Sequence, residues 1–105
     1  MIYKVKAKII DDRVSELFSK LTDGTIENQK PDGYEIVASM RRAVITESGI
    51  AEWYEMCLCP TPLYHERTTQ FDYHFTDITT EEADDYGTIE GESFWSYMEK
   101  KNVQQ

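Results

Sequence analysis

The alternation of residues 2–10 is the feature that most narrows the folds open to this chain. In the sequence IYKVKAKII, three lysines occupy one face of an extended segment, and Tyr3, Val5 and Ala7 occupy the other. A period of two residues indicates a β-strand with one buried face and one solvated face. The lysines also discourage pairing between exposed sheet edges. We therefore expect the chain to begin with a strand of a sheet that is covered on one side.

The hydrophobic period changes immediately after this strand. Val14, Leu17, Phe18 and Leu21 follow the spacing i, i+3, i+4 and i+7, which predicts an amphipathic helix over residues 11–22. Aspartates at its start and a glycine just past its end are typical helix boundaries. The polar segment that follows this helix is predicted to be a loop.

The middle of the chain predicts a short helix followed by a β-hairpin. A glutamate three residues after Asp32 resembles a capping box and favours a helix over residues 34–40, with a strand as the alternative. β-Branched residues favour a strand from about Arg41. A turn at residues 47–49 then joins two strands within residues 41–59, which gives the hairpin.

The second half of the chain contains a proline-bounded segment and an acidic one. Prolines end the second hairpin strand, so residues 61–69 are predicted to be a loop or one helical turn. The alternation of residues 71–76 predicts a fourth strand. Residues 79–92 contain six acids and no base, which predicts a mobile linker. Residues 93–101 are predicted to form a short helix that packs on the rest of the chain.

Together these elements predict an α+β fold in a single domain. Its sheet has about four mainly antiparallel strands, with helices packed on one face and a short C-terminal helix in addition. The order of the elements fits a ferredoxin-like arrangement only loosely. In that arrangement the short segment 61–69 would have to serve as the second crossover between strands. The expected organisation is a core domain over residues 1–78, an acidic linker over 79–92 and a docked helix over 93–101.

The charge distribution excludes some classes of partner. The net charge is −9, and most of it lies in residues 76–105, which carry two basic and eight acidic side chains. Nucleic acid and anionic membrane surfaces are not expected as partners, because both require a basic surface. The N-terminus lacks the apolar region of a signal peptide, and no run approaches the roughly 20 apolar residues of a membrane helix. A cytoplasmic protein with reduced thiols is the expectation, as a monomer or a homodimer.

The cysteines and histidines are concentrated between residues 57 and 74. Cys57, Cys59, His65 and His74 are ligand types that zinc prefers. Their C-x-C-x5-H-x8-H spacing is not typical of zinc sites, so the favoured interpretation places the cysteines in the core and expects no cofactor. A cysteine nucleophile paired with His65 is a weaker alternative, because neither a helix N-terminus nor a glycine-rich loop accompanies the thiols.

The strongest candidate for a binding site is the polar run after the prolines. Tyr64, His65, Glu66 and Arg67 are four consecutive functional side chains on a predicted surface loop. Arg67 can hold a carboxylate or phosphate with two hydrogen bonds, and the neighbouring histidine and glutamate can perform acid–base chemistry. Of the two interpretations of this run, the favoured one is structural: these side chains pin the loop through hydrogen bonds.

Two further pairs of residues are candidates for binding. The adjacent arginines Arg41 and Arg42 can attract an anion. Phe94 and Trp95 lie on the predicted C-terminal helix, and aromatic side chains of this kind serve as anchors in protein interfaces.

No motif in the chain is specific for a reaction. The sequence therefore predicts a non-catalytic domain that binds a protein or a small anionic ligand. Its binding surface is expected to combine the loop at residues 60–67 with the C-terminal helix. The alternative is an enzyme or a zinc-binding protein whose site lies between Cys57 and His74.

Overall fold

The computed structural model describes residues 1–103, and its centre is an antiparallel sheet with the strand order β4-β1-β3-β2-β5. The strands are β1 (Ile2–Ile9), β2 (Val44–Glu47), β3 (Ile50–Met56), β4 (Phe75–Ala83) and β5 (Glu92–Ser93). The helical segments are η1 (Asp11–Arg13), α1 (Val14–Thr22), α2 (Gly33–Arg42), α3 (Tyr64–Glu66), the π-helical turn η2 (Arg67–Phe71), α4 (Asp72–His74) and α5 (Phe94–Val103).

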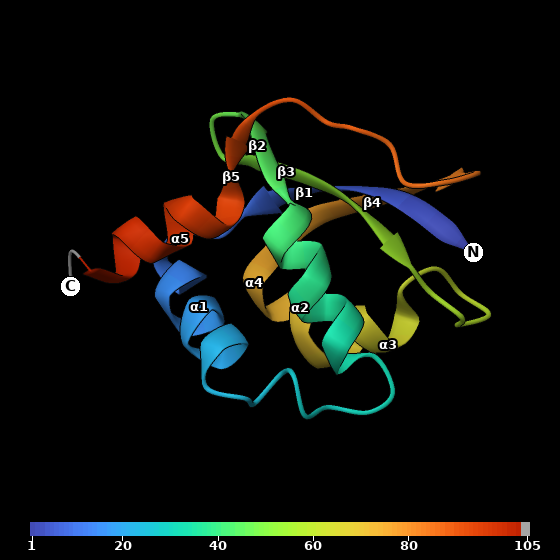
Figure 1. Cartoon of the computed structure of the whole chain (residues 1–105), viewed down its shortest axis with the longest axis horizontal. Coiled ribbons are helices and arrows are strands. Elements are labelled where there is room, and N and C mark those ends of the chain that lie inside the picture. Colours follow the sequence, from blue (N-terminus) through green and yellow to red (C-terminus); the bar gives the residue numbers. More distant parts are fainter. Residues whose placement is uncertain (104–105) are drawn as a thin grey trace.

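The order of the first four strands confirms the expected α+β class. β1 pairs with β3 on one side and with β4 on the other, and both pairs are antiparallel. The helices α1 and α2 connect β1 to β2, and the helical run from α3 to α4 connects β3 to β4, all on one face of the sheet (Figure 1). This is the split βαβ order that the sequence indicated. The sheet has a fifth strand because β5 pairs with β2 at its edge.

Alternation along the strands separates the two faces of the sheet. Tyr3, Val5 and Ala7 of β1 are buried against the helices, as predicted, whereas the lysines between them are not. On β3, the buried residues Trp53 and Glu55 follow the same alternation. The aromatic side chains at the centre of the core pack 5.3–6.0 Å apart between ring centroids; they are Trp53, Phe71, Phe75 and Phe94.

The helix predicted over residues 34–40 is longer than expected. α2 continues to Arg42, so the strand expected from Arg41 starts instead at Val44. The helix continues because Ile36 and Met40, one helical turn apart, are both wholly buried. Arg42 also closes the last turn with hydrogen bonds to side chains of the same helix.

The fourth strand starts later than the sequence indicated. Residues 64–74 are helical. The helical turn expected as one alternative over 61–69 therefore extends to His74, and the strand predicted over 71–76 is wrong for residues 71–74. The buried side chains Glu66, Gln70, Phe71 and His74 follow a helical spacing. Tyr73, which mimics a strand pattern with its neighbours, is 55% exposed. The helical run supplies the second crossover that the strand order requires.

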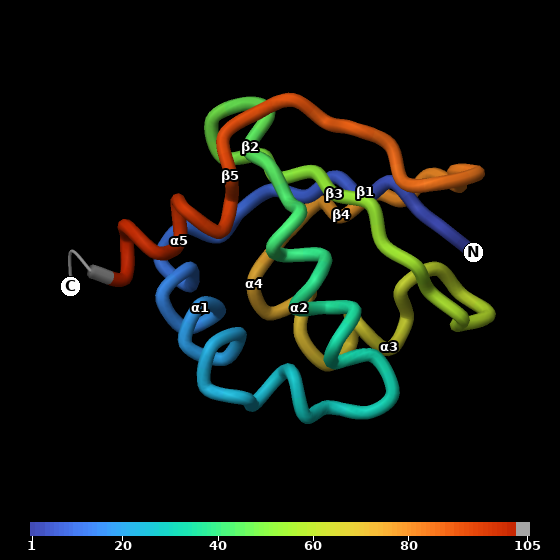
Figure 2. The backbone as a smooth tube through the Cα atoms, viewed as in Figure 1, coloured from blue at the N-terminus to red at the C-terminus, as the bar shows by residue number. Residues whose placement is uncertain are grey.

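Part of the acidic segment belongs to the sheet. Residues 79–83 form the end of β4, so the expected linker is reduced to the connection between β4 and β5. That connection crosses the molecule from the end of β4 to β5 (Figure 2). It is attached to α2 through Tyr86, whose hydroxyl donates to Glu35 over 2.9 Å and whose ring lies 4.5 Å from the Arg42 guanidinium.

Candidate functional site

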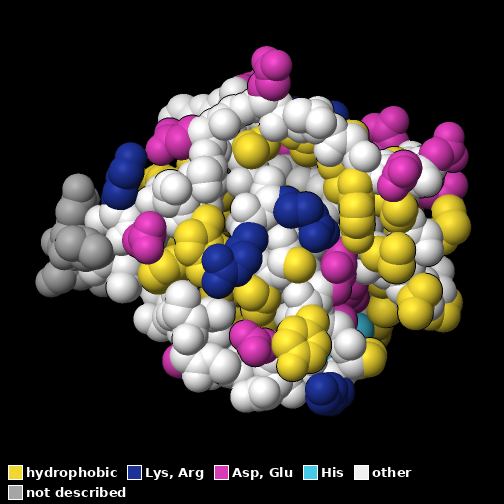
Figure 3. Space-filling view, in the orientation of Figure 1, with side chains coloured by type: hydrophobic (Ala, Val, Ile, Leu, Met, Phe, Trp, Pro, Cys, Tyr) yellow, Lys and Arg dark blue, Asp and Glu magenta, His cyan; other side chains and the backbone are white. Residues whose placement is uncertain are grey.

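A pocket of about 330 Å³ lies between the start of α2, the end of β3 and α3. Hydrophobic side chains gather over this part of the surface, at the right of the space-filling view (Figure 3). Leu58, which lines the pocket, is 89% exposed. The volume is at the lower end of the range for ligand pockets. The lining residues are Pro31, Asp32, Glu35, Met56, Cys57, Leu58, Cys59, His65 and Glu66.

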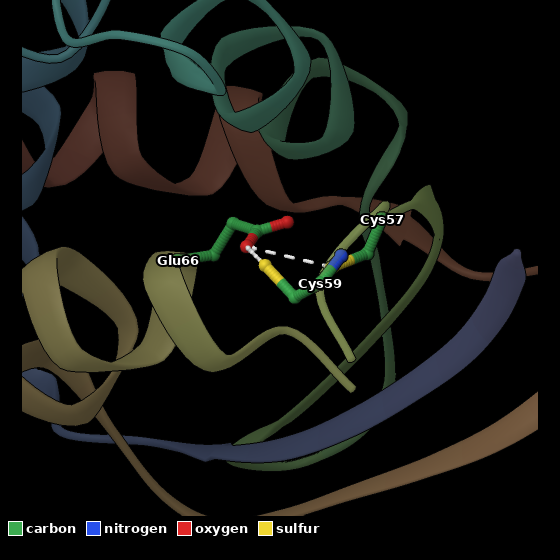
Figure 4. A group of neighbouring side chains, drawn as sticks. All are labelled: Cys57, Cys59 and Glu66. Atoms are coloured by element: carbon green, nitrogen blue, oxygen red, sulfur yellow. Dashed lines mark hydrogen bonds between the residues drawn. The ribbon is translucent and has the colours of Figure 1, made fainter. Parts of the chain in front are cut away.

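The fold brings β3 and α3 together at the floor of this pocket. The inward alternation of Trp53 and Glu55 continues past the end of β3 to Cys57, which is also buried. Leu63, with φ of 56°, turns the chain sharply before α3. A left-handed leucine is rare, and its wholly buried side chain holds the turn in place. The turn directs Glu66 back toward the cysteines (Figure 4).

Both thiols lie against the same carboxylate oxygen. The Sγ atoms of Cys57 and Cys59 are 3.7 Å and 3.6 Å from Oε1 of Glu66. The backbone N–H of Cys59 donates to Cys57 Sγ over 3.2 Å. Burial raises the pKa of the Cys57 thiol to about 12. Cys57 is therefore a neutral thiol at physiological pH as long as no cation is bound beside it.

A second carboxyl group lies behind this cluster. Glu55 is wholly buried, and its Oε1 accepts a 2.8 Å hydrogen bond from the indole N–H of Trp53. Its Oε2 has no hydrogen-bond donor within residues 1–103. Burial, followed by the proximity of Glu66, raises the pKa of Glu55 well above its usual value. No ion pair links either carboxyl to a basic side chain in the described part of the chain.

The mouth of the pocket carries polar groups that are already paired. His65 Nδ1 lies 2.5 Å from Oδ2 of Asp32, and Gln29 donates to the other oxygen of that aspartate. Glu35 accepts hydrogen bonds from Arg42 at 3.0 Å and from the backbone N–H of Met56 at 2.9 Å. These pairs fix the position of α2 relative to β3 and α3, which frame the opening.

The predicted polar run is divided by the helix that contains it. His65 and Glu66 line the pocket, whereas Tyr64 and Arg67 do not. Tyr64 is 60% exposed, and Arg67 forms a 3.1 Å ion pair with Asp72. The helical geometry explains the division, because consecutive residues of a helix point about 100° apart.

The histidines predicted as zinc ligands do not join the cysteines as a set of four. His65 is held by Asp32. His74 is 2% exposed, and the charged groups that act on it come from η1 and α1: Arg13, Glu16 and Lys20. Burial lowers the pKa of His74 to about 4. Glu66 takes the place that the sequence interpretation gave to a histidine.

Of the remaining candidates, Arg42 reaches the mouth of the pocket through its ion pair with Glu35, whereas Arg41, Phe94 and Trp95 do not line it. Phe94 is wholly buried, and the ring of Trp95 lies 4.2 Å from the guanidinium of Arg41. α5 and α3 are at opposite ends of the molecule (Figure 1). The loop at residues 60–67 and the C-terminal helix therefore do not form the single binding surface that the sequence indicated.

Comparisons with known proteins add no assignment: no family model, curated protein or solved structure matches this chain. Within residues 1–103, no helix combines the length and the apolar character that crossing a bilayer requires.

Proposed function

We propose that this protein is a binding domain for a small cation, and that the pocket between α2, β3 and α3 is its site. The observation that carries this proposal is that two carboxyl side chains, Glu55 and Glu66, are buried and have no basic partner among the described residues.

Two buried carboxyl groups are costly to ionise when neither has a basic partner. Removing a charge from water is strongly unfavourable, and two carboxylates sharing a site disfavour each other's ionisation. The pair can be relieved by holding a proton or by binding a cation from solution. Because a pocket opens directly onto Glu66, a cation can reach it without unfolding the domain.

The distribution of basic side chains supports a cationic ligand over the anionic one that the sequence favoured. The arginines expected to hold an anion already have partners: Arg67 pairs with Asp72, Arg42 pairs with Glu35 of the pocket lining, and Arg41 lies over the ring of Trp95. The one histidine in the pocket lining is held by an aspartate.

Titration with a matched pair of small molecules tests the sign of the preferred charge. Phenethylammonium and 3-phenylpropanoate have similar apolar bodies and opposite charges. We expect phenethylammonium to shift the backbone amide resonances of residues 56–59 and 65–66 in two-dimensional NMR spectra of the full chain, and 3-phenylpropanoate to leave them in place. Equal shifts with both molecules, larger shifts with 3-phenylpropanoate, or a lack of response at these residues to both phenethylammonium and a divalent metal ion would overturn the proposal.

Two surface variants control for the location of binding. Leu58 is 89% exposed and lines the pocket, so Leu58→Ser should weaken phenethylammonium binding without affecting the fold. Tyr73 is 55% exposed and lies outside the pocket, so Tyr73→Ser should bind as the unmodified chain does. Equal affinities for the two variants would place binding elsewhere.

A further inference from the structure

We infer that the cation bound in this pocket is a thiophilic divalent metal ion of the zinc class, held by Cys57 Sγ, Cys59 Sγ and a carboxylate oxygen of Glu66. The inference rests on the proposed cation-binding function and names the ligand of the same site. The three ligand atoms lie within 4.8 Å of one another, and they come from the end of β3, the loop after it and α3.

The separations between these atoms suit a tetrahedral ion. With Zn–S of about 2.3 Å and Zn–O of about 2.1 Å, tetrahedral angles place a sulfur and an oxygen roughly 3.6 Å apart. The sulfur atoms of Cys57 and Cys59 lie 3.7 Å and 3.6 Å from Glu66 Oε1. An ion can therefore enter between the three side chains with little movement of the backbone.

Glu55 is an independent indication that the site accepts a cation. Its side chain is wholly buried, and its Oε2 lacks a partner within residues 1–103. Carboxylates that bind a metal are commonly oriented by a further polar group behind them. Glu55 is a buried group of this kind next to the cysteine segment, and Trp53 holds it with a 2.8 Å hydrogen bond.

The mixture of ligand types selects among divalent ions. Thiolates favour zinc and similar ions, whereas calcium and magnesium require oxygen ligands. Binding converts both thiols to thiolates, so two protons leave for the solvent and two S–metal bonds form, with no change in oxidation state. Three protein ligands leave the fourth position of a tetrahedral ion for water or for an atom of a ligand in the pocket.

Titration of the reduced, metal-free full chain with Co²⁺ tests the inference, because thiolate–cobalt bonds produce charge-transfer absorption in the near ultraviolet. We expect this absorption to saturate at one ion per chain and to disappear when Zn²⁺ is added. Ca²⁺ should not displace the cobalt. Cobalt binding without charge-transfer absorption, or absorption that Zn²⁺ does not remove, would overturn the inference.

Variants identify the ligands. Cys59→Ser and Glu66→Gln each remove one ligand and should weaken metal binding by at least about 100-fold. Glu27→Gln removes an exposed carboxylate that does not line the pocket, and it should leave the affinity for the metal unchanged. The NMR spectrum of each variant shows whether it folds. If Glu66→Gln does not fold, the more exposed Cys59 still provides the test, and unchanged cobalt absorption in a folded Cys59→Ser protein would overturn the inference.

The outcomes separate this inference from the function on which it rests. A chain that binds phenethylammonium at the pocket but shows no thiolate–cobalt absorption has a cation site that is not a metal site. A chain that responds to neither cation at residues 56–59 and 65–66 contradicts both proposals.

Discussion

Trp53 and Glu55 lie two residues apart on β3, both wholly buried, and the indole N–H of one donates a 2.8 Å hydrogen bond to a carboxyl oxygen of the other. We expect Trp53→Phe to lower the free energy of unfolding by about 1–3 kcal/mol for the lost buried hydrogen bond, with a further loss from the smaller ring. Urea unfolding at neutral pH measures the change.

Tyr3 provides the matched control for this variant. It lies directly opposite Glu55 in the pairing of β1 with β3 and is buried, but its hydroxyl forms no hydrogen bond to another described residue. Tyr3→Phe should therefore lower the free energy of unfolding clearly less than Trp53→Phe does. Equal losses for the two variants would show that the hydrogen bond to Glu55 does not stabilise the fold.

His74 makes the stability of the domain sensitive to mild acid. Its pKa is lowered to about 4 in the folded chain, mainly by burial, whereas an unfolded histidine titrates near 6.5. Between these two values the unfolded chain binds a proton that the folded chain does not, so the free energy of unfolding falls as pH decreases from about 6.5 toward 4. The full effect of this one group is on the order of 3 kcal/mol.

Comparison of two histidine variants isolates this effect from the titration of carboxylates. The free energy of unfolding of His74→Leu should depend less on pH between 6.5 and 4 than that of the unmodified chain. His65→Gln changes a partly exposed histidine and should retain the dependence that His74 causes. The midpoints of urea unfolding, measured across this pH range, test the expectation. Midpoints that change with pH in the same way for His74→Leu and for the unmodified chain would contradict it.

The C-terminal helix contributes a wholly buried aromatic residue to the core. Phe94 is wholly buried and packs 5.8 Å from Phe75 between ring centroids. Phe94→Ala should cost about 3–5 kcal/mol of stability because it leaves a cavity in the core. Tyr97→Phe on the same helix removes only a hydroxyl contact to the exposed Asp11 and should cost less than about 1 kcal/mol. Thermal unfolding that shows similar losses for both variants would mean that α5 is not part of the core.

The two thiols should differ in reactivity in the reduced, metal-free chain. Cys57 is 3% exposed, whereas Cys59 is only partly buried. Because a thiol must be accessible to react, iodoacetamide should modify Cys59 first and Cys57 only after denaturation. Mass spectrometry of digested samples taken over time gives the order. Modification of both cysteines at the same rate in the folded chain would contradict the burial of Cys57.

Local sequence patterns identify much of this fold because they reflect burial directly. The alternation around Val5 and the helical spacing around Leu17 each match the buried face observed. The error in the second crossover has a physical cause. Phe71 and Phe75 are both buried, and a spacing of four residues fits a helix as well as a strand. The turn at Leu63 that starts the helix depends on tertiary packing, which a local pattern does not contain.

The candidate site could be predicted only in part from the sequence, for a similar reason. The segment containing Cys57, Cys59 and Glu66 stands out by composition, but its histidines do not join these three side chains. His65 pairs with Asp32 in the pocket lining, and His74 is buried on α4. Glu55 was missed, although a signal existed: it is in phase with the inward-facing Trp53. An acid on the buried face of a strand is unusual enough to mark a site, but its partner on α3 becomes visible only once the chain is folded.

Anomalous diffraction at the zinc absorption edge, from crystals of the full chain grown with Zn²⁺, tests the central claim most directly. We expect one dominant peak within bonding distance of Cys57 Sγ, Cys59 Sγ and a carboxylate oxygen of Glu66. A zinc peak found only at surface carboxylates, or no peak between these three side chains, would contradict the claim that this pocket is a metal-binding site.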